Sequence, residues 1–200
     1  MRGVKEILSA GPPPPAPGAE RYPALDLANS AFNLPGGRRV DLVGEPAGAD
    51  QWLFERGLAP AGAGLREECA AQLRALREHV RALFAARVAE APAPAPALAA
   101  VNEALMRVPA PSLLRWDPER GLHRETAHPV TRIVEHALAV LAADAADLLT
   151  GEDAGRLMAC GSPPCDRYLL RNGRRTWCTT RCGDRARAAR AYARRTRATG

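Results

Sequence analysis

The chain has 200 residues, 46% apolar and 25% charged, enough for one ordinary domain with its own core and a second, smaller one. It has no run of about 18 apolar residues, which excludes a membrane-spanning pattern. Ile7 and Leu8 are followed at once by Gly11 and four prolines, which excludes the pattern of a signal peptide. We therefore expect a soluble, cytoplasmic protein.

Positive charge is concentrated at the C-terminal end. Residues 1–154 hold 16 Lys and Arg against 20 Asp and Glu, a net charge of −4, whereas residues 155–200 hold 12 Arg against two Asp, a net charge of +10. Single arginines mean little in a chain whose only lysine is Lys5, but this asymmetry favours a polyanion as the partner of the C-terminal segment.

The first 21 residues are predicted to be a disordered, Pro-rich tail. Residues 9–19 contain only Pro, Gly and Ala after Ser9, so they cannot bury a core and should form a mobile, extended tether. Structure is expected to begin near Tyr22. The apolar run over residues 24–28 that follows is too short to assign as strand or helix.

The region from residue 40 to residue 106 is predicted to be mainly helical. Residues 40–43 are a short strand candidate, and a short helix with Trp52 and Leu53 inward should end at Gly57. Residues 65–90 form the clearest helix, and the Ala-Pro alternation over residues 91–97 must break it before another helix at 98–106. Its apolar stripe repeats at three- and four-residue steps: Leu65, Cys69, Leu73, Leu76, Val80, Leu83 and Phe84.

The rest of this first domain is predicted to be a β-hairpin and a second long helix. Residues 112–117 and 121–126 flank a turn-like segment, and a helix with one apolar face should run from Pro129 to about Leu149. Residues 22–152 are therefore expected to form a mainly α domain.

Four cysteines within 23 residues, Cys160, Cys165, Cys178 and Cys182, predict one structural zinc ion. Gly161, Pro163 and Pro164 force a reversal that can bring the first pair together. The second pair has an i, i+4 relation, so both sulfurs can lie on one face of a helix beginning near Thr180. Because protein thiolates fill all four positions, this metal has no open site for catalysis.

Residues 153–200 are expected to form a small, treble-clef-like zinc finger with a β-hairpin and a C-terminal helix. Asn172-Gly173 lies between two β-prone runs and predicts a type I′ turn. In the helix, four arginines fall in one sector, while Ala186, Ala189, Ala193 and Thr196 fall opposite and could pack. We expect phosphate contacts from Arg171, Arg174, Arg175, Arg185, Arg187, Arg190, Arg194 and Arg197.

The run Trp177-Cys178-Thr179-Thr180-Arg181-Cys182-Gly183-Asp184-Arg185 resembles the CGNR-type zinc fingers. In that family the finger usually follows an ABATE domain, described for putative stress-induced transcription regulators. The run Leu25-Asp26-Leu27-Ala28-Asn29-Ser30 is similar to the opening of that domain, and Asp41-Leu42 leading to Trp52-Leu53 is similar to its next block. The resemblance implies a stress-response regulator that binds DNA.

Two positions depart from the family pattern. Asp184 stands where the name-giving asparagine is expected, and Leu170 where an aspartate is common. An anion near a helix start is favoured by the helix dipole but repels phosphate, which argues against a direct nucleic-acid contact by Asp184.

Two functional hypotheses follow from the residues. In the first, the finger binds double-stranded DNA and the larger domain senses a small molecule or mediates dimerisation. A dimer is expected if binding is specific, because a single finger covers little DNA. In the second, the finger is a zinc-stabilised module for an acidic protein or RNA, without sequence-specific DNA binding. Competition between duplex DNA, RNA and a polyacid would discriminate between them.

An enzyme in the first domain is not expected, because its sequence has no metal-ligand histidine spacing and no Gly-rich phosphate loop. His79 and His136 are interpreted as surface or boundary residues of helices. A ligand pocket could be lined by four residues of this domain: Asn29, Trp116, His123 and His128. The alternative is that these residues have only structural roles, such as turn or capping contacts.

Overall fold

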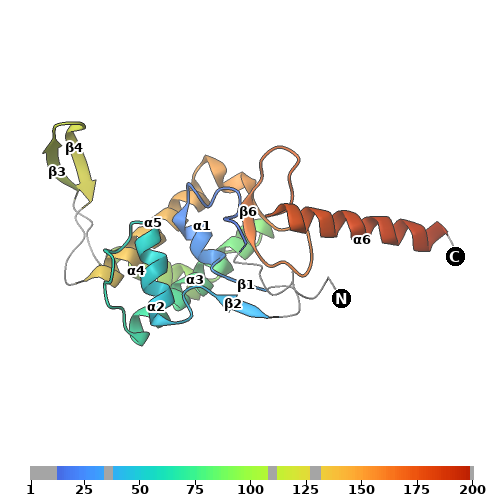
Figure 1. Ribbon diagram of the computed structural model, residues 1–200, viewed down its shortest axis with the longest axis horizontal. Coiled ribbons are helices and arrows are strands. Elements are labelled where there is room, and N and C mark those ends of the chain that lie inside the picture. Colours follow the sequence, from blue (N-terminus) through green and yellow to red (C-terminus); the bar gives the residue numbers. More distant parts are fainter. Residues whose placement is uncertain (1–12, 34–37, 108–111, 127–131, 199–200) are drawn as a thin grey trace, which may run out of the picture.

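A computed structural model describes residues 13–33, 38–107, 112–126 and 132–198 (Figure 1). None of the helices in these ranges is long and apolar enough to cross a membrane. In chain order the elements are α1 (Pro23–Ala28), β1 (Ala31–Asn33), β2 (Arg39–Asp41), α2 (Pro46–Glu55), α3 (Glu67–Val88), α4 (Ala95–Met106), β3 (Ser112–Asp117), β4 (Gly121–Thr126), α5 (Ile133–Thr150), the 3-10 helix η2 (Glu152–Arg156), β5 (Leu157–Ala159), β6 (Tyr168–Leu170) and α6 (Thr180–Ala198).

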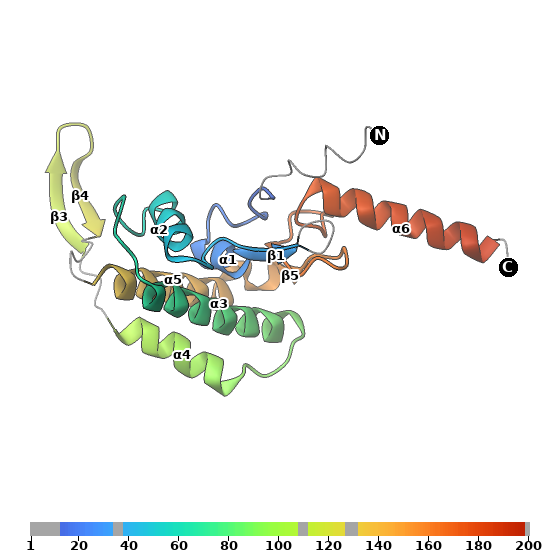
Figure 2. The ribbon, with the colours of Figure 1, turned by 60° about the horizontal axis from the view of Figure 1, so that its bottom comes forward.

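The predicted fold class is confirmed: a mostly helical N-terminal region with small hairpins precedes a C-terminal hairpin, a helix and a four-cysteine cluster. The three sheets of the described residues are antiparallel strand pairs, β1 with β2, β3 with β4 and β5 with β6. Figure 2 shows α3, α4 and α5 side by side in the body, with α6 leaving it at one end and the β3–β4 hairpin at the other.

The core lies between α3 and the helices packed on it. The predicted stripe of α3 buries Leu73, Val80 and Phe84 completely, and Leu141 and Leu148 of α5 are buried opposite. Cys69 is only half-buried at the edge of this core, and Ala70 is the fully buried residue of that turn. His136, expected to be a surface or boundary residue, is instead 1% exposed within α5.

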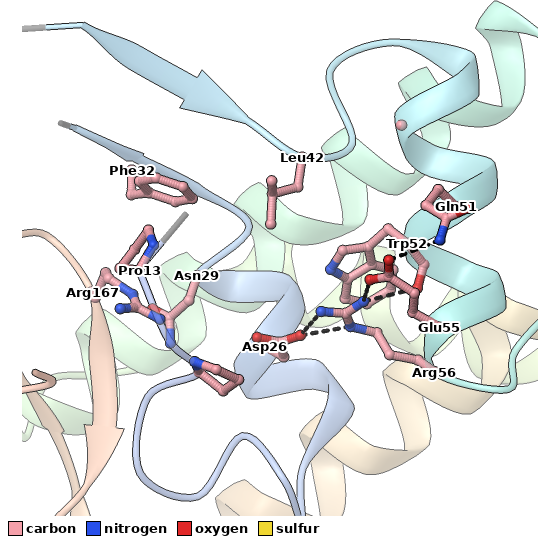
Figure 3. Close-up of a pocket in the computed structure, with 12 residues that line it drawn as sticks. Pro13, Asp26, Asn29, Phe32, Leu42, Gln51, Trp52, Glu55, Arg56 and Arg167 are labelled. Atoms are coloured by element: carbon pink, nitrogen blue, oxygen red, sulfur yellow. Dashed lines mark hydrogen bonds and ion pairs between the residues drawn. The ribbon is translucent and has the colours of Figure 1, made fainter. Parts of the chain in front are cut away.

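The run that sequence left unassigned over residues 24–28 is a helix. Pro23 occupies the first turn of α1, where its fixed φ suits a helix start and no N–H is needed. Asp26 on α1 forms an ion pair with Arg56, which follows α2, and the Arg56 guanidinium lies 4.1 Å from the centre of the Trp52 ring (Figure 3). These contacts fix α1 against α2.

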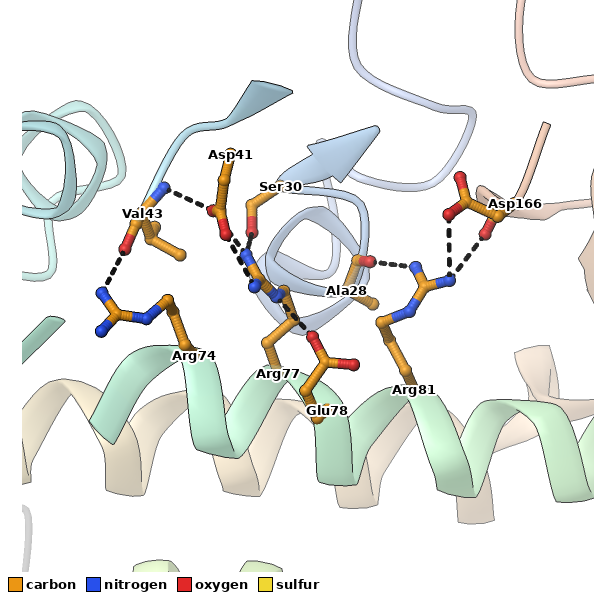
Figure 4. A network of polar contacts seen from close by, with 9 residues as sticks. All are labelled: Ala28, Ser30, Asp41, Val43, Arg74, Arg77, Glu78, Arg81 and Asp166. Atoms are coloured by element: carbon orange, nitrogen blue, oxygen red, sulfur yellow. Dashed lines mark hydrogen bonds and ion pairs between the residues drawn. The ribbon is translucent and has the colours of Figure 1, made fainter. Parts of the chain in front are cut away.

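A buried arginine joins α3 to the strand segment, which the apolar pattern did not predict. Arg77 is 4% exposed and donates to both carboxylate oxygens of Asp41, at 2.6 and 2.9 Å, and to the hydroxyl of Ser30 at 3.1 Å (Figure 4). Burial alone would raise the pKa of the Asp41 carboxyl, but the hydrogen bonds and charge of Arg77 bring it below its usual value.

The hairpin of the finger differs from the prediction. β6 pairs with β5, with Ala159 opposite Tyr168, so the Cys160–Cys165 loop connects the two strands. The Asn172-Gly173 turn therefore does not join the paired strands. Gly173 has φ +57° but Asn172 has no positive φ, so the turn is not type I′.

The expected disordered tail is wrong for residues 13–21, which the structure describes; residues 1–12 lie outside the described residues. Ala16 is fully buried beside the cysteines, and the carbonyl of Pro17 accepts from the N–H of Leu170. Gly18 has φ +97° and lies so close to Leu170 that a Cβ would come within 2.6 Å of it. The composition alone did not predict this order, because the contacts of Ala16, Pro17 and Gly18 with the finger are made with residues distant in the sequence.

Asp144 supplies a test of the packing of α1 on α5. Its carboxylate accepts from the N–H of Ala24 at 2.7 Å. Burial raises the pKa of Asp144 to about 6, against the opposing hydrogen bond from Ala24, and the charge of Asp147 adds to the rise. Since the folded-state pKa lies above the unfolded value, this contribution to stability is present below about pH 4 and is lost as the pH rises to about 6.

Asp144→Asn should therefore be more stable than the wild type at pH 7, by about 1 to 2 kcal/mol, and close to it at pH 4.5. The amide oxygen keeps the bond from Ala24 and carries no charge to desolvate. Urea unfolding at both pH values measures the difference. Equal destabilisation at both values would contradict the assignment.

Candidate metal centre

The four predicted ligands meet in one place. The sulfur atoms of Cys160, Cys165, Cys178 and Cys182 all lie within 4.8 Å of one another, and Cys160, Cys178 and Cys182 are buried. Cys178 Sγ is 3.6 Å from both Cys165 Sγ and Cys182 Sγ. A disulfide would need about 2.05 Å, whereas a tetrahedron of sulfurs at about 2.3 Å from zinc has edges of about 3.8 Å. The cluster thus fits one structural zinc ion.

Short backbone hydrogen bonds build the loop that carries the first pair. The N–H of Cys165 donates to the carbonyl of Ser162, and the N–H of Gly161 to the carbonyl of Thr176. For the second pair, the hydroxyl of Thr179 accepts from the N–H of Cys182 and so caps the start of α6. This cap fixes the first turn of α6, and with it the position of Cys182 relative to Cys178.

A close contact explains the presence of two further residues of the finger motif, Trp177 and Gly183. The indole of Trp177 lies against the first turn of α6, and a Cβ on Gly183 would come within 2.5 Å of its Nε1 atom. Only glycine leaves room for the ring at this position. The tryptophan therefore braces the helix that carries Cys182.

Two arginines lie against the sulfurs. Arg167 is 4% exposed, and its Nη1 is 3.9 Å from Cys178 Sγ. Arg185 donates to Cys182 Sγ at 3.4 Å. Four thiolates around a divalent ion carry a net charge of −2, which two guanidinium groups balance. Sequence analysis did not single out Arg167, because its position two residues after Cys165 is the only signal it leaves.

The thiols interact strongly with one another. Hydrogen bonds from Cys165 and Cys178 lower the pKa of Cys160 to about 2, while the same contact with Cys160 raises the pKa of Cys165. Without a metal the cluster would share protons, whereas a zinc ion binds the thiolates and displaces those protons. The donor set and its spacing therefore match a zinc site.

The finger is fastened to the helical domain through Asn29. Its side-chain amide donates to the carbonyl of Tyr168 at 2.9 Å and accepts from the N–H of Tyr168 at 2.8 Å. Arg81 of α3 adds a second bridge, because its guanidinium donates to the carbonyls of Ala28 and Asp166 (Figure 4). Asn29, buried at 3%, thus has a structural role.

The predicted phosphate-contacting arginines fall into two groups. Arg185 donates to the hydroxyl and carbonyl of Ser162, and Arg175 to the carbonyls of Trp177 and Cys178, so these two guanidinium groups turn towards the finger. Arg187 is paired with Asp184 at 2.5 Å and lies 5.6 Å from the centre of the Trp177 ring. Exposed side chains remain at Arg171, Arg174, Arg190 and Arg194.

Arg197 lies in the last turn of α6, where the side chains are outside the described part of the chain. Of the alanine face expected to pack, Ala186 is half-buried, whereas Ala189 and Ala193 are exposed, because α6 leaves the body after its first turn (Figure 2).

Of the four candidate pocket residues, the structure places the side chains of Asn29 and Trp116, and these two lie apart. Asn29 lies at the finger, whereas Trp116 is 68% exposed on the β3–β4 hairpin at the opposite end (Figure 1). His123 has a described backbone only, opposite Arg115 in β4, and His128 lies outside the described residues.

Comparison with protein families matches both parts of the chain. Residues 22–152 match the ABATE family, described as putative stress-induced transcription regulators. The chain belongs to the ABATE family. Residues 156–195 match the CGNR zinc finger, and this second match coincides with the four-cysteine cluster. Comparison of the chain with curated proteins gives no significant match.

The residues that carried the resemblance to the ABATE family have structural roles. Asp26 accepts a hydrogen bond from Arg56, and the side-chain amide of Asn29 pairs with the backbone of Tyr168. Ser30 and Asp41 both accept hydrogen bonds from the buried Arg77. The opening motif of this ABATE domain therefore joins α1 to α2, to α3 and to the zinc finger.

Gly183→Ala should weaken the finger. Alanine has the higher helix propensity by about 1 kcal/mol, but its Cβ would overlap the Trp177 indole, an overpacking that costs about 1 to 3 kcal/mol. We expect faster transfer of zinc to a colorimetric chelator. Gly155→Ala is the matched control, because a Cβ there meets nothing within 4 Å; equal zinc-transfer rates for the two variants would contradict the role given to Trp177.

Proposed function

We propose that the chain is a cytoplasmic transcription regulator that binds double-stranded DNA through its zinc finger and α6. In this proposal the ABATE domain is the regulatory part, which senses a small molecule or mediates homodimer formation. Family membership supports regulation of transcription, and it points away from an enzyme. Free thiols are kept reduced in the cytoplasm, which suits a four-thiolate site.

The observation that carries DNA binding is the exposed, basic arm, defined here as residues 184–198. No residue from 184 to 195 is buried, and these twelve residues hold five arginines and one aspartate. A helix with so little buried surface is stabilised at its base by the zinc finger, and its exposed side chains can meet another surface. Guanidinium groups at this density favour a row of phosphates.

The hydrogen bonds of the arginines separate those that hold the backbone of the finger from those whose side chains stay on the surface of α6, where Arg190 Nε donates to the carbonyl of Ala186 in the same helix. Arg175 and Arg185 donate to the backbone of the finger, so replacing them would damage the zinc site as well. Arg190 and Arg194 are exposed on the arm, one turn apart. They are therefore the better probes of phosphate contact.

Binding of the zinc-loaded protein to duplex DNA should depend steeply on salt, with a log-log slope of roughly −4.5 for five phosphate contacts. Replacing Arg190 and Arg194 together by Gln should make the slope shallower by about 1.8 and weaken binding to all sequences alike. Fluorescence anisotropy at several salt concentrations measures both quantities.

The matched control replaces Arg66 and Arg120 by Gln, which removes the same charge from exposed sites in the helical domain. Equal losses in the two double variants would contradict a specific role for the arm. Stronger binding to single-stranded RNA or to a polyacid than to duplex DNA would favour an interaction module instead.

Asp184→Asn tests the departure from the finger pattern. The Asp184 carboxylate holds Arg187 at 2.5 Å, so the amide should release that guanidinium and remove a charge that repels phosphate. We expect DNA binding several-fold tighter and a slope steeper by up to about 0.9. Glu103→Gln on α4 is the control; no change in Asp184→Asn relative to it would contradict this role of Asp184.

A further inference from the structure

A cleft of about 340 Å³ lies where the helical domain meets the finger and the Pro-rich segment. Figure 3 shows Trp52 and Arg56 on one side of it and Arg167, Asn29 and Phe32 on the other. Its volume is at the small end of the range for ligand sites. The lining residues are Pro13, Pro15, Asp26, Asn29, Phe32, Leu42, Gly48, Gln51, Trp52, Glu55, Arg56 and Arg167.

Two buried N–H donors of this cleft have no acceptor among the described residues: Nε1 of Trp52 and Nε of Arg167. Trp52 is 2% exposed and Arg167 is 4% exposed. An unsatisfied buried donor costs about 1 to 3 kcal/mol, so native structures rarely leave one. Two such donors lining one cleft call for a molecule that brings acceptor atoms.

The charged groups on the Trp52 side of the cleft are already paired. Arg56 holds both Asp26 and Glu55, and Gln51 donates to Glu55 at 2.8 Å. Arg167 offsets part of the thiolate charge through Nη1, which lies 3.9 Å from Cys178 Sγ, and its Nη2 donates to the carbonyl of Pro14, but its buried Nε has no acceptor among the described residues. A carboxylate oxygen at Arg167 Nε would supply the missing acceptor through a charge-assisted hydrogen bond.

Apolar and polar side chains both line the cleft. Phe32, Leu42, Pro13 and Pro15 are the apolar ones and the indole of Trp52 adds a flat surface. Asn29 and Asp26 lie between Arg167 and Trp52 (Figure 3). Rigid, flat side chains favour a flat occupant, since it can contact several of them at once. Acceptor oxygens are then needed at the edges of the occupant, where the N–H groups lie.

We infer that this cleft binds a small planar carboxylate that carries a second acceptor oxygen, such as a hydroxylated aromatic acid. The carboxylate accepts from Arg167, and the second oxygen accepts from Trp52. Such a ligand contacts the ABATE domain, the Pro-rich segment and a residue beside Cys178, so it deepens the sensing part of the function proposed above.

The first experiment titrates the full-length, zinc-loaded protein with 4-hydroxybenzoate by calorimetry. We expect one-to-one binding, at least tenfold tighter than that of the neutral 4-hydroxybenzamide, because only the acid brings a charge to Arg167. Trp52→Phe keeps an aromatic ring but removes the N–H donor, and should weaken binding about five- to tenfold. Trp116→Phe makes the same change on the exposed hairpin and should have no effect.

A second pair of variants avoids the core. Gln51→Glu adds a negative charge at the exposed edge of the cleft and should weaken 4-hydroxybenzoate binding several-fold, while Gln72→Glu on α3 adds it elsewhere and should not. Absence of binding at millimolar concentration, equal binding of acid and amide, or equal effects within either pair of variants would overturn the inference. None of these titrations contains DNA, so their failure is distinct from a failure of the DNA-binding proposal.

Discussion

Mutual repulsion of four thiolates is the constraint on which the C-terminal zinc finger depends. Sulfurs within 4.8 Å of one another cannot all ionise unless a cation lies between them, and a divalent ion with two arginines nearby brings the local charge to zero. Once that ion is bound, the loop from β5 to β6 and the first turn of α6 are fixed to the same point. The arm of α6 has few other contacts with the body, so its direction follows from the geometry of the metal.

The ABATE domain and the finger share polar contacts as well as core. Asn29 pairs with the backbone of Tyr168, and Arg81 bridges α1 and Asp166, which precedes β6. The Pro-rich segment before the ABATE domain adds the carbonyl of Pro14, which accepts from Arg167. Tyr168 also places its ring 5.7 Å from that of Phe84, inside the helical core. A molecule bound in the cleft beside Arg167 would therefore contact both halves at once. If the ABATE domain has the regulatory role proposed above, this arrangement gives it a direct physical route to the zinc site.

Local patterns in the sequence were sufficient for most of the fold. The helical repeat of α3, the β3–β4 hairpin and the cysteine spacing all depend on near neighbours, and the structure has each of them. Features that depend on distant partners were not predicted. Arg77 is buried because Asp41 and Ser30 accept its hydrogen bonds. Strand β6 pairs with β5 and not with residues 175–177, which are nearer in the sequence. For the same reason Arg175 and Arg185 were predicted to contact phosphate, although their guanidinium groups donate hydrogen bonds to backbone carbonyls of the finger. The family resemblance located the motifs but not these contacts.

Metal analysis combined with thiol counting on the tag-free, full-length protein tests the central claim most directly. We predict one zinc ion per chain, with Cys69 the only thiol that reacts quickly under native conditions and all five reacting after chelation and unfolding. Removal of zinc should also abolish DNA binding, because the arm would lose its base. A protein that contains no stoichiometric metal, or whose C-terminal cysteines prove to be paired as disulfides, would contradict the account.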